Sequence, residues 1–571
     1  MHSNTSRRTF VKALAAGGLL GGLGLWRSPV WALTSLGEPT VLAGTEFDLF
    51  IDQAPANFTG SSRTALTVNG SLPGPLLRWR EGDTVTLRVK NRLAEPTSIH
   101  WHGILLPSTM DGVPGLSFKG IEPGGVYVYQ FQVKQHGTYW YHSHSGFQEQ
   151  QGVYGPLVID PREPEPFTCQ RDYVVMLSDW TDEDPVALMK TLKKQSDYYN
   201  QHKPTVGDFV RDVDKQGWSA TAADRLMWAQ MKMNPTDLAD VSGETYTYLL
   251  NGQPPGRGWT GVFKAGETIR LRFINGSAMT YFDVRIPGLK MTVIAADGQP
   301  VQPVSVEEFR IAVAETFDVL VEPTDVAYTL FAQSMDRSGY ARGTLARQAG
   351  AVAQVPAVDP RPWITMGDMG MGGMDHGAMA DMPDMPDMAG MDHSAMSMPA
   401  HPATEQGNPL VDMQAMSPVP KLDDPGIGLR NNGRRVLTYA DLRSTFEDPD
   451  GRDPGRTLEL HLTGHMEKFA WSFNGVKFSD AEPLQLTYGE RVRLVLVNDT
   501  MMSHPIHLHG LWSDLEDENG QFQVRKHTID MPPGSRRSYR VTADALGRWA
   551  YHCHLLYHME MGMFREVRVH E

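Results

Sequence analysis

Near the C-terminus, one cysteine lies between two histidines and is followed by a third histidine and a methionine: His552, Cys553, His554, His558 and Met563. The residues just before them are typical of a strand, in which successive side chains point to opposite faces. Cys553 should therefore face one way, and His552 and His554 the other. Thiolate, imidazole and a distant thioether are the ligand set of a blue-copper electron-transfer site. One strand could hold such a copper and also present two imidazoles to other metal ions behind it.

Three more His-x-His pairs could supply partners for those two imidazoles: His100/His102, His142/His144 and His507/His509. Residues two apart in a strand share a face and lie about 6–7 Å apart, which suits two neighbouring metal ions better than one. Four pairs give eight imidazoles, enough for a three-copper cluster, and His504 is left for the blue site. One His-x-His pair is a weak signal, but four pairs with His-Cys-His in one chain are highly specific.

These motifs resemble those of the multicopper oxidases, in the family's order: H-W-H-G, H-S-H, H-P-I-H-L-H-G and H-C-H-x3-H-x4-M. The resemblance covers nearly the whole mature chain and is greatest to the CopA-type periplasmic copper-resistance enzymes, which are cuprous oxidase- and laccase-like. It implies four copper ions. The implied type 1 ligands are His504, Cys553, His558 and Met563; the type 2 ligands are His100 and His507; the type 3 ligands are His102, His142 and His554 for one copper and His144, His509 and His552 for the other.

The family also needs acids that supply protons to reduced oxygen. Asp111 matches an acidic position common among the relatives, whereas its ordinary structural role would be to begin a turn before Gly112. Leu556 and Met559 occupy positions that are acidic in some relatives. Glu560 is the nearest substitute, so we expect Asp111 and Glu560 to be the catalytic acids.

The N-terminus, residues 1–32, resembles a Tat signal peptide, with Arg7, Arg8 and Phe10 before a short, glycine-rich apolar run. An ordinary Sec signal is the alternative. Cleavage of residues 1–32 removes four cationic residues and changes the formal charge of the chain from −15 to −19. An acidic surface argues against nucleic-acid binding and favours attraction of metal cations. We expect a soluble periplasmic protein without stable membrane insertion. The two cysteines provide no disulfide framework, and Cys169 is expected to be a buried free thiol.

Short β-patterned runs separated by turn signals dominate the mature chain and predict an all-β protein. We expect three consecutive cupredoxin-like β-sandwich domains, at residues 38–162, 168–350 and 430–571. The second domain carries no His-x-His pair and is expected to be a spacer, with a helical insertion at about 185–240. Because the first and third domains each supply half of the paired histidines, the cluster should lie at their interface.

Residues 363–420 form a low-complexity linker in which methionine is mixed with Asp, Gly, Pro and His. Methionines without aliphatic partners cannot build a core, and thioether is a soft ligand that selects Cu(I). The alternative is a linker whose composition has no function. We expect Cu(I) capture by Met366, Met369, Met371, Met374, Met379, Met382, Met385, Met388 and Met391.

The expected function is periplasmic oxidation of Cu(I) coupled to four-electron reduction of O2 to water, for copper resistance. A laccase-type phenol oxidase is one alternative. A non-catalytic copper-sequestering protein is another, although such a protein needs no trinuclear cluster. Besides O2 and Cu(I), the expected partners are the Tat export machinery and periplasmic copper carriers, and the chain is expected to be a monomer.

Overall fold

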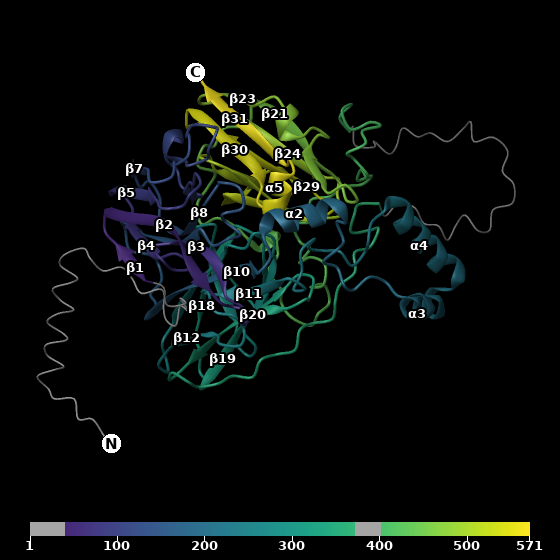
Figure 1. Cartoon of the computed structure of the whole chain (residues 1–571), viewed down its shortest axis with the longest axis horizontal. Helices are drawn as coiled ribbons and strands as arrows, with labels where there is room; N and C mark the ends of the chain where they lie inside the picture. The colour runs from purple at the N-terminus through teal and green to yellow at the C-terminus, as the bar shows by residue number, and fades with distance from the viewer. Residues whose placement is uncertain (1–39, 372–400) are drawn as a thin grey trace, which may run out of the picture.

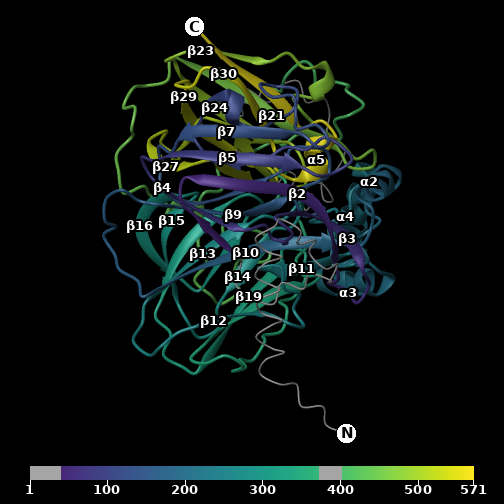
Figure 2. The same cartoon turned by 60° about the vertical axis from the view of Figure 1, so that its left-hand side comes forward.

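The computed structural model describes residues 40–371 and 401–571. Their strands form six sheets that pair into three sandwiches in chain order. Figures 1 and 2 show the third sandwich lying beside the first, with the second below both. The expected all-β architecture is confirmed. Among the described residues, no helix is long and apolar enough to cross a membrane.

The first sandwich pairs a five-stranded sheet, β1-β4-β9-β8-β6, with a four-stranded sheet, β3-β2-β5-β7. Buried and exposed residues largely alternate along β2, as expected for a sheet with one face on a core. The strands are β1 (Val41–Ala43), β2 (Glu46–Ala56), β3 (Arg63–Val68), β4 (Leu76–Arg80), β5 (Thr84–Asn91), β6 (His100–His102), β7 (Val126–Gln132), β8 (Gly137–His142) and β9 (Tyr154–Asp160).

The second sandwich has sheets ordered β11-β10-β13-β18-β15-β16 and β12-β20-β19-β14-β17. Its strands β13 and β14 are buried along their whole lengths, so this domain has a core of its own. The strands are β10 (Arg171–Thr181), β11 (Tyr246–Leu250), β12 (Trp259–Val262), β13 (Ile269–Asn275), β14 (Phe282–Arg285), β15 (Met291–Ala296), β16 (Gln299–Val306), β17 (Glu308–Ile311), β18 (Thr316–Val321), β19 (Ala327–Ser334) and β20 (Tyr340–Ala346).

The insertion between β10 and β11 is helical, as expected, with α2 (Pro185–Lys194), α3 (Val206–Gln216) and α4 (Trp218–Met231). Asp184 caps α2 by accepting a hydrogen bond from the Ala187 amide at 2.8 Å, and Pro185 suits the first helical turn. Both views show α2 beside α5 (Leu556–Glu560) of the third domain. The insertion therefore reaches the end of the chain that carries the Cys553 motif.

The third sandwich has sheets ordered β22-β21-β24-β29-β26-β27 and β23-β31-β30-β25-β28. The strand β30, which ends at Cys553, lies between β25 and β31 in the second of these sheets. The strands are β21 (Arg456–His465), β22 (Ala470–Phe473), β23 (Leu484–Thr487), β24 (Arg491–Asn498), β25 (His504–Leu508), β26 (Ser513–Glu516), β27 (Phe522–Lys526), β28 (Thr528–Met531), β29 (Arg536–Thr542), β30 (Gly547–Cys553) and β31 (Phe564–His570).

The structure differs from the expected linker at both of its described ends. Met369 is fully buried, and the next residue, Gly370, accepts a hydrogen bond from the Ser417 amide at 2.9 Å. Further along, the Ala415 amide donates to Asp499 Oδ1 at 2.7 Å. Residues 363–371 and 401–420 are thus packed against folded domains, where their backbone groups form hydrogen bonds. Amino-acid composition alone does not indicate such contacts. Residues 372–400 lie outside the described residues.

Candidate copper centres

The residues expected at the blue site converge at the end of β30. Antiparallel pairing of β25 with β30 sets Ile506 opposite Cys553, which brings His504, two residues before Ile506, close to the thiol. The Cys553 Sγ lies 3.5 Å from His504 Nδ1 and 3.9 Å from His558 Nδ1. Met563 is fully buried, and its carbonyl accepts a hydrogen bond from the Cys553 amide at 3.1 Å. Two imidazoles and one thiol therefore face one another in a buried site.

The paired histidines gather on the other side of β30. Register places His100 opposite His142 in the first domain and His507 opposite His552 in the third. Arg548 bonds to the Leu116 carbonyl at 2.9 Å across the interface of these domains. The ligand atoms lie within 4.8 Å of one another in each of three groups: His100, His102 and His507; His102, His142 and His554; and His144, His509 and His552.

The hydrogen bonds of these rings leave lone pairs that need a cation. A ring nitrogen beside a carbonyl must donate, and so His552 Nδ1 donates to the Cys553 carbonyl at 2.9 Å. His509 Nδ1 in turn donates to the Asp111 carboxylate at 2.9 Å. Burial lowers the pKa of His552 to about 3, so its ring is neutral and its Nε2 keeps a lone pair. Yet His509 Nε2 and His552 Nε2 lie 3.0 Å apart.

Two facing lone pairs repel unless a metal ion lies between or beside them. The pattern continues at His100 and His507, whose Nδ1 atoms donate to the carbonyls of Asp111 and His527 at 2.9 and 2.6 Å. Their Nε2 atoms are buried without a hydrogen-bond partner among the described residues. Burial also raises the pKa of the Cys553 thiol well above its usual range, so a thiolate there requires a metal. The residues fit copper.

Two carboxylates contact the paired histidines of the candidate cluster, and only one of them was expected. Asp111 is 3% exposed at its side chain and bonds to His509, as an outer partner that orients a metal ligand. Glu149 is equally buried, and its Oε2 lies 2.7 Å from His142 Nδ1. Burial raises the pKa of Glu149 well above its usual range, so its carboxyl can hold a proton beside the cluster.

The expectation for Glu560 needs correction. This residue ends α5 and is exposed, and no hydrogen bond or ion pair joins its carboxylate to a ligand histidine in the described part of the chain. Helix α5 turns the side chain outward, which spacing along the sequence could not indicate. The second carboxylate that contacts these histidines is Glu149, which follows the His142/His144 pair by only a few residues; proximity to that motif was the available signal.

Asp240 is a further residue that the motifs did not reveal. It lies in the loop between α4 and β11, and its Oδ2 lies 2.7 Å from His558 Nε2. Both side chains have no exposed area. Trp471 stacks on the same imidazole with ring centroids 3.9 Å apart. The second domain is therefore more than the expected spacer, because it covers the outer edge of a blue-site histidine.

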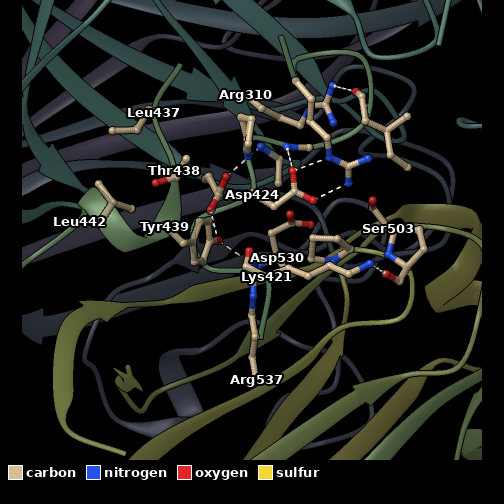
Figure 3. Close-up of a pocket in the computed structure, with 18 of the residues that line it drawn as sticks. Arg310, Lys421, Asp424, Leu437, Thr438, Tyr439, Leu442, Ser503, Asp530 and Arg537 are labelled. Carbon is tan, nitrogen blue, oxygen red and sulfur yellow. Dashed lines mark hydrogen bonds and ion pairs between the residues drawn. The ribbon is translucent and has the colours of Figure 1, made fainter. Parts of the chain in front are cut away.

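The cleft above Asp240 is narrow and polar. Asp237, Asp240, Asp336 and Arg361 are among its lining residues, and its volume is about 10 Å³, enough for about one water-sized species. A larger cleft lies at the junction of the second and third domains (Figure 3). Its walls are lined by paired charges such as Arg430 and Asp424, and the four ligands assigned to the blue site are absent from its lining.

The structure also shows where some of the expected Cu(I)-binding methionines and Cys169 lie. Met366 and Met371 are partly buried against the core, and Met369 is fully buried. Met374, Met379, Met382, Met385, Met388 and Met391 lie outside the described residues. Cys169 is a free thiol of intermediate exposure. His527, which the motifs did not include, is buried with Nδ1 3.2 Å from His102 Nε2.

Known proteins share both the sequence and the fold. Family models described as multicopper oxidase match residues 51–164, 171–350 and 451–571. Copper resistance protein A of Pseudomonas syringae pv. tomato is 72% identical over the whole of both chains, and that of Escherichia coli is 69% identical over 99% of each.

Solved structures agree at the level of the fold. A multicopper oxidase from Pseudomonas thermotolerans superposes with a TM-score of 0.57 at 22% identity, over 93% of this chain and all of that one. Fet3p, a multicopper oxidase that functions in iron import, gives a TM-score of 0.64 at 18% identity, over 92% and 90%. With three matched family models and relatives of about 70% identity along the whole chain, this protein belongs to the multicopper oxidase family.

Proposed function

We propose that this multicopper oxidase oxidises Cu(I) in the periplasm as part of copper resistance. The observation that carries the proposal is the contact of Asp240 with His558 beneath a cleft of about 10 Å³. A carboxylate attracts a small cation, and the cleft is too small for an aromatic ring. Relatives named for copper resistance support the physiological setting.

The proposed ligands are those that the sequence motifs imply. Type 1 copper takes His504, Cys553, His558 and Met563; type 2 copper takes His100 and His507; and the type 3 pair takes His102, His142, His144, His509, His552 and His554. When bound, these coppers supply one-electron oxidation at type 1 and reduction of O2 at the cluster. In balance, four Cu(I) ions, one O2 and four protons give four Cu(II) ions and two waters.

The protein's own contribution starts at the outer edge of His558. Asp240 holds this imidazole by its Nε2. Burial raises the pKa of Asp240 to about 8, and an approaching cation favours the ionised carboxylate, which attracts the cation in turn. Trp471 stacks on the ring and helps exclude water. Cys553 is bonded through its backbone to both His552 and His554, so only a few covalent bonds separate the blue site from the cluster.

Asp111 and Glu149 serve the opposite end of the reaction. Each is buried and contacts a ligand histidine, so each can orient an imidazole and hold a proton where oxygen is reduced. Protons reaching the cluster must cross a buried interface, and carboxyl groups placed there shorten that path. We propose Asp111 and Glu149 as the acids that deliver them.

A phenol oxidase remains the alternative reaction, because an aromatic donor could be oxidised at the protein surface above His558. Comparison of steady-state O2 uptake with Cu(I) and with a neutral phenol, on one sample carrying four coppers, separates the two. We expect a much higher kcat/KM for Cu(I). A phenol used better than Cu(I) would contradict the proposal, and negligible turnover of both would favour copper sequestration.

Residues 1–32 would direct export through the Tat machinery, and periplasmic copper carriers would be partners. We propose a monomer. The expected methionines of residues 363–391 other than Met369 would collect Cu(I), whereas Met369 is buried in the folded protein and would not.

A further inference from the structure

A second group of metal-ligand side chains lies outside the copper centres. It contains His401, Glu405, His461 and Asp499, whose ligand atoms all lie within 4.8 Å of one another. An ion bound at about 2.0–2.2 Å brings its donors within about 4.4 Å of each other, so the group is nearly closed around one point. His461 belongs to β21 and Asp499 follows β24, two neighbouring strands. The other two side chains come from the segment packed on these strands.

The carboxylates are held from behind. Asp499 Oδ1 accepts the Ala415 amide at 2.7 Å, and Glu405 Oε2 accepts Gln414 Nε2 at 2.9 Å. The other oxygen of each carboxylate is turned toward the histidines. Asp499 Oδ2 lies 2.6 Å from His461 Nδ1, and Glu405 Oε1 lies 3.8 Å from the same nitrogen. Asp499 Oδ2 accepts a hydrogen bond from His461 Nδ1, which an ion at this point would replace. Outer hydrogen bonds to the other oxygen of each carboxylate are typical of metal-binding carboxylates.

Two of the inward atoms lack partners. Glu405 has no exposed side-chain area, yet its Oε1 has no hydrogen-bond partner within the described residues. His401 Nδ1 is also buried without one, although it lies 3.3 Å from both Glu405 Oε2 and Asp499 Oδ2. These atoms are close but not aligned for hydrogen bonding with each other. Burying polar atoms in this way costs free energy unless a cation satisfies them.

We propose that His401, Glu405, His461 and Asp499 form a fifth metal site that binds Cu(II). Two imidazoles and two carboxylates suit a divalent transition metal, whereas Cu(I) prefers sulfur donors and Mg²⁺ or Ca²⁺ prefers oxygen alone. Among divalent ions of the first row, such donors bind Cu²⁺ most tightly. Two buried carboxylates also balance the two charges of the ion.

The site would fasten residues 401–415 to the third domain. His401 and Glu405 are on that segment, and His461 and Asp499 are on the sandwich, so an ion joins the two. Asp499 also lies five residues before His504, and the intervening Thr500 bonds to His504 Nε2 at 2.8 Å. The ion would therefore bind close along the chain to a blue-site ligand without sharing any of its donor atoms.

The test is a metal count on the full protein. Enzyme already carrying four coppers is titrated with Cu(II) and, separately, with Zn(II), and bound metal is measured after gel filtration. We expect one further Cu(II), with a tetragonal electron paramagnetic resonance signal that shows coupling to nitrogen. Glu405→Gln and His461→Gln should weaken its binding by at least about 100-fold, since even outer-shell changes cost 10- to 100-fold.

His136→Gln is the matched control, because His136 pairs with Glu81 at 3.1 Å in the first domain and should leave the fifth ion unchanged. Retained blue absorbance shows that each variant has folded. Added Cu(II) should also raise the melting temperature of the wild type more than that of Glu405→Gln. A count that stays at four in the wild type, a fifth ion kept by both variants, or binding of Zn(II) without Cu(II) would each overturn the assignment.

Discussion

Replacing Asp240 with asparagine tests how a cation reaches the blue site. Asparagine has nearly the same size, and its Oδ1 can still accept the hydrogen bond that His558 Nε2 makes with Asp240 at 2.7 Å. Burial raises the pKa of Asp240 to about 8, so the change removes the negative charge that the carboxyl carries when it is ionised, while the imidazole stays in place. Because Asp240 has no exposed side-chain area, little solvent screens the lost charge.

The size of the effect follows from Coulomb's law. A carboxylate and a monovalent cation about 4 Å apart attract by about 4 kcal/mol at an effective dielectric constant of about 20. Dehydration of the ion and partial protonation of Asp240 at neutral pH offset part of this, and we take about 2 kcal/mol as the net loss. That free energy corresponds to about a 30-fold lower kcat/KM for Cu(I).

The assay is O2 uptake with Cu(I) and, in parallel, with a neutral phenol. Asp240→Asn should lower kcat/KM for Cu(I) and leave that for the phenol within a few fold. Asp224→Asn is the control, since Asp224 is on α4 of the same insertion and pairs with Arg225 at 2.8 Å. Equal losses for both substrates would mean that Asp240 only positions His558, and an unchanged rate with Cu(I) would refute the reasoning.

Four more outcomes are expected. Cys553→Ser should abolish the blue absorbance and turnover but not the fold, seen by absorption and circular dichroism. Asp111→Ala should accept electrons normally but be reoxidised slowly by O2 in stopped flow, because a carboxyl group beside His509 is lost. A Gly/Ser linker of equal length in place of residues 372–400 should keep four coppers and phenol turnover while raising KM for Cu(I), because local capture is lost. Although burial opposes it, hydrogen bonds from Arg548 and Arg568 lower the pKa of Glu566 to about 2. The contribution of ionised Glu566 to folding stability should be complete above about pH 4.3 and lost as the pH falls to about 2. In denaturant unfolding, Glu566→Gln should therefore lower the free energy of unfolding by about 1 kcal/mol at pH 7 and by much less at pH 2.

The sequence predicted those parts of the site that strand geometry determines. Alternation along one strand separates Cys553 from His552 and His554, and this is a property of any strand. The structure brings the motif histidines together as that argument requires, with His507 opposite His552. Spacing within a strand is a local property, so it can be read without knowledge of the fold.

Contacts between distant segments could not be predicted in this way. Asp240 reaches His558 across more than three hundred residues, and nothing near Asp240 in the sequence marks it. Glu560 seemed suitable by its distance from Cys553, but α5 directs it to solvent. In the sequence, Met369 could not be distinguished from the other methionines of the low-complexity segment. Its burial depends on contacts with residues near Gly534. Each of these outcomes depends on tertiary packing, which overrides local composition.

The three domains contribute to the candidate site in different ways, some through paired strands and one through loops. The first and third sandwiches hold the ligand histidines on paired strands, so any change in register there would move several ligands at once. The second sandwich contacts the blue site through a loop, at Asp240, and through the Ala278 carbonyl, which accepts the Leu556 amide at 3.0 Å. Loops tolerate substitution better than paired strands. Under the proposed function, changes in the insertion would alter which reductant reaches His558 while the assigned copper ligands stay fixed. Substrate choice would then lie in the domain that carries none of the assigned ligands.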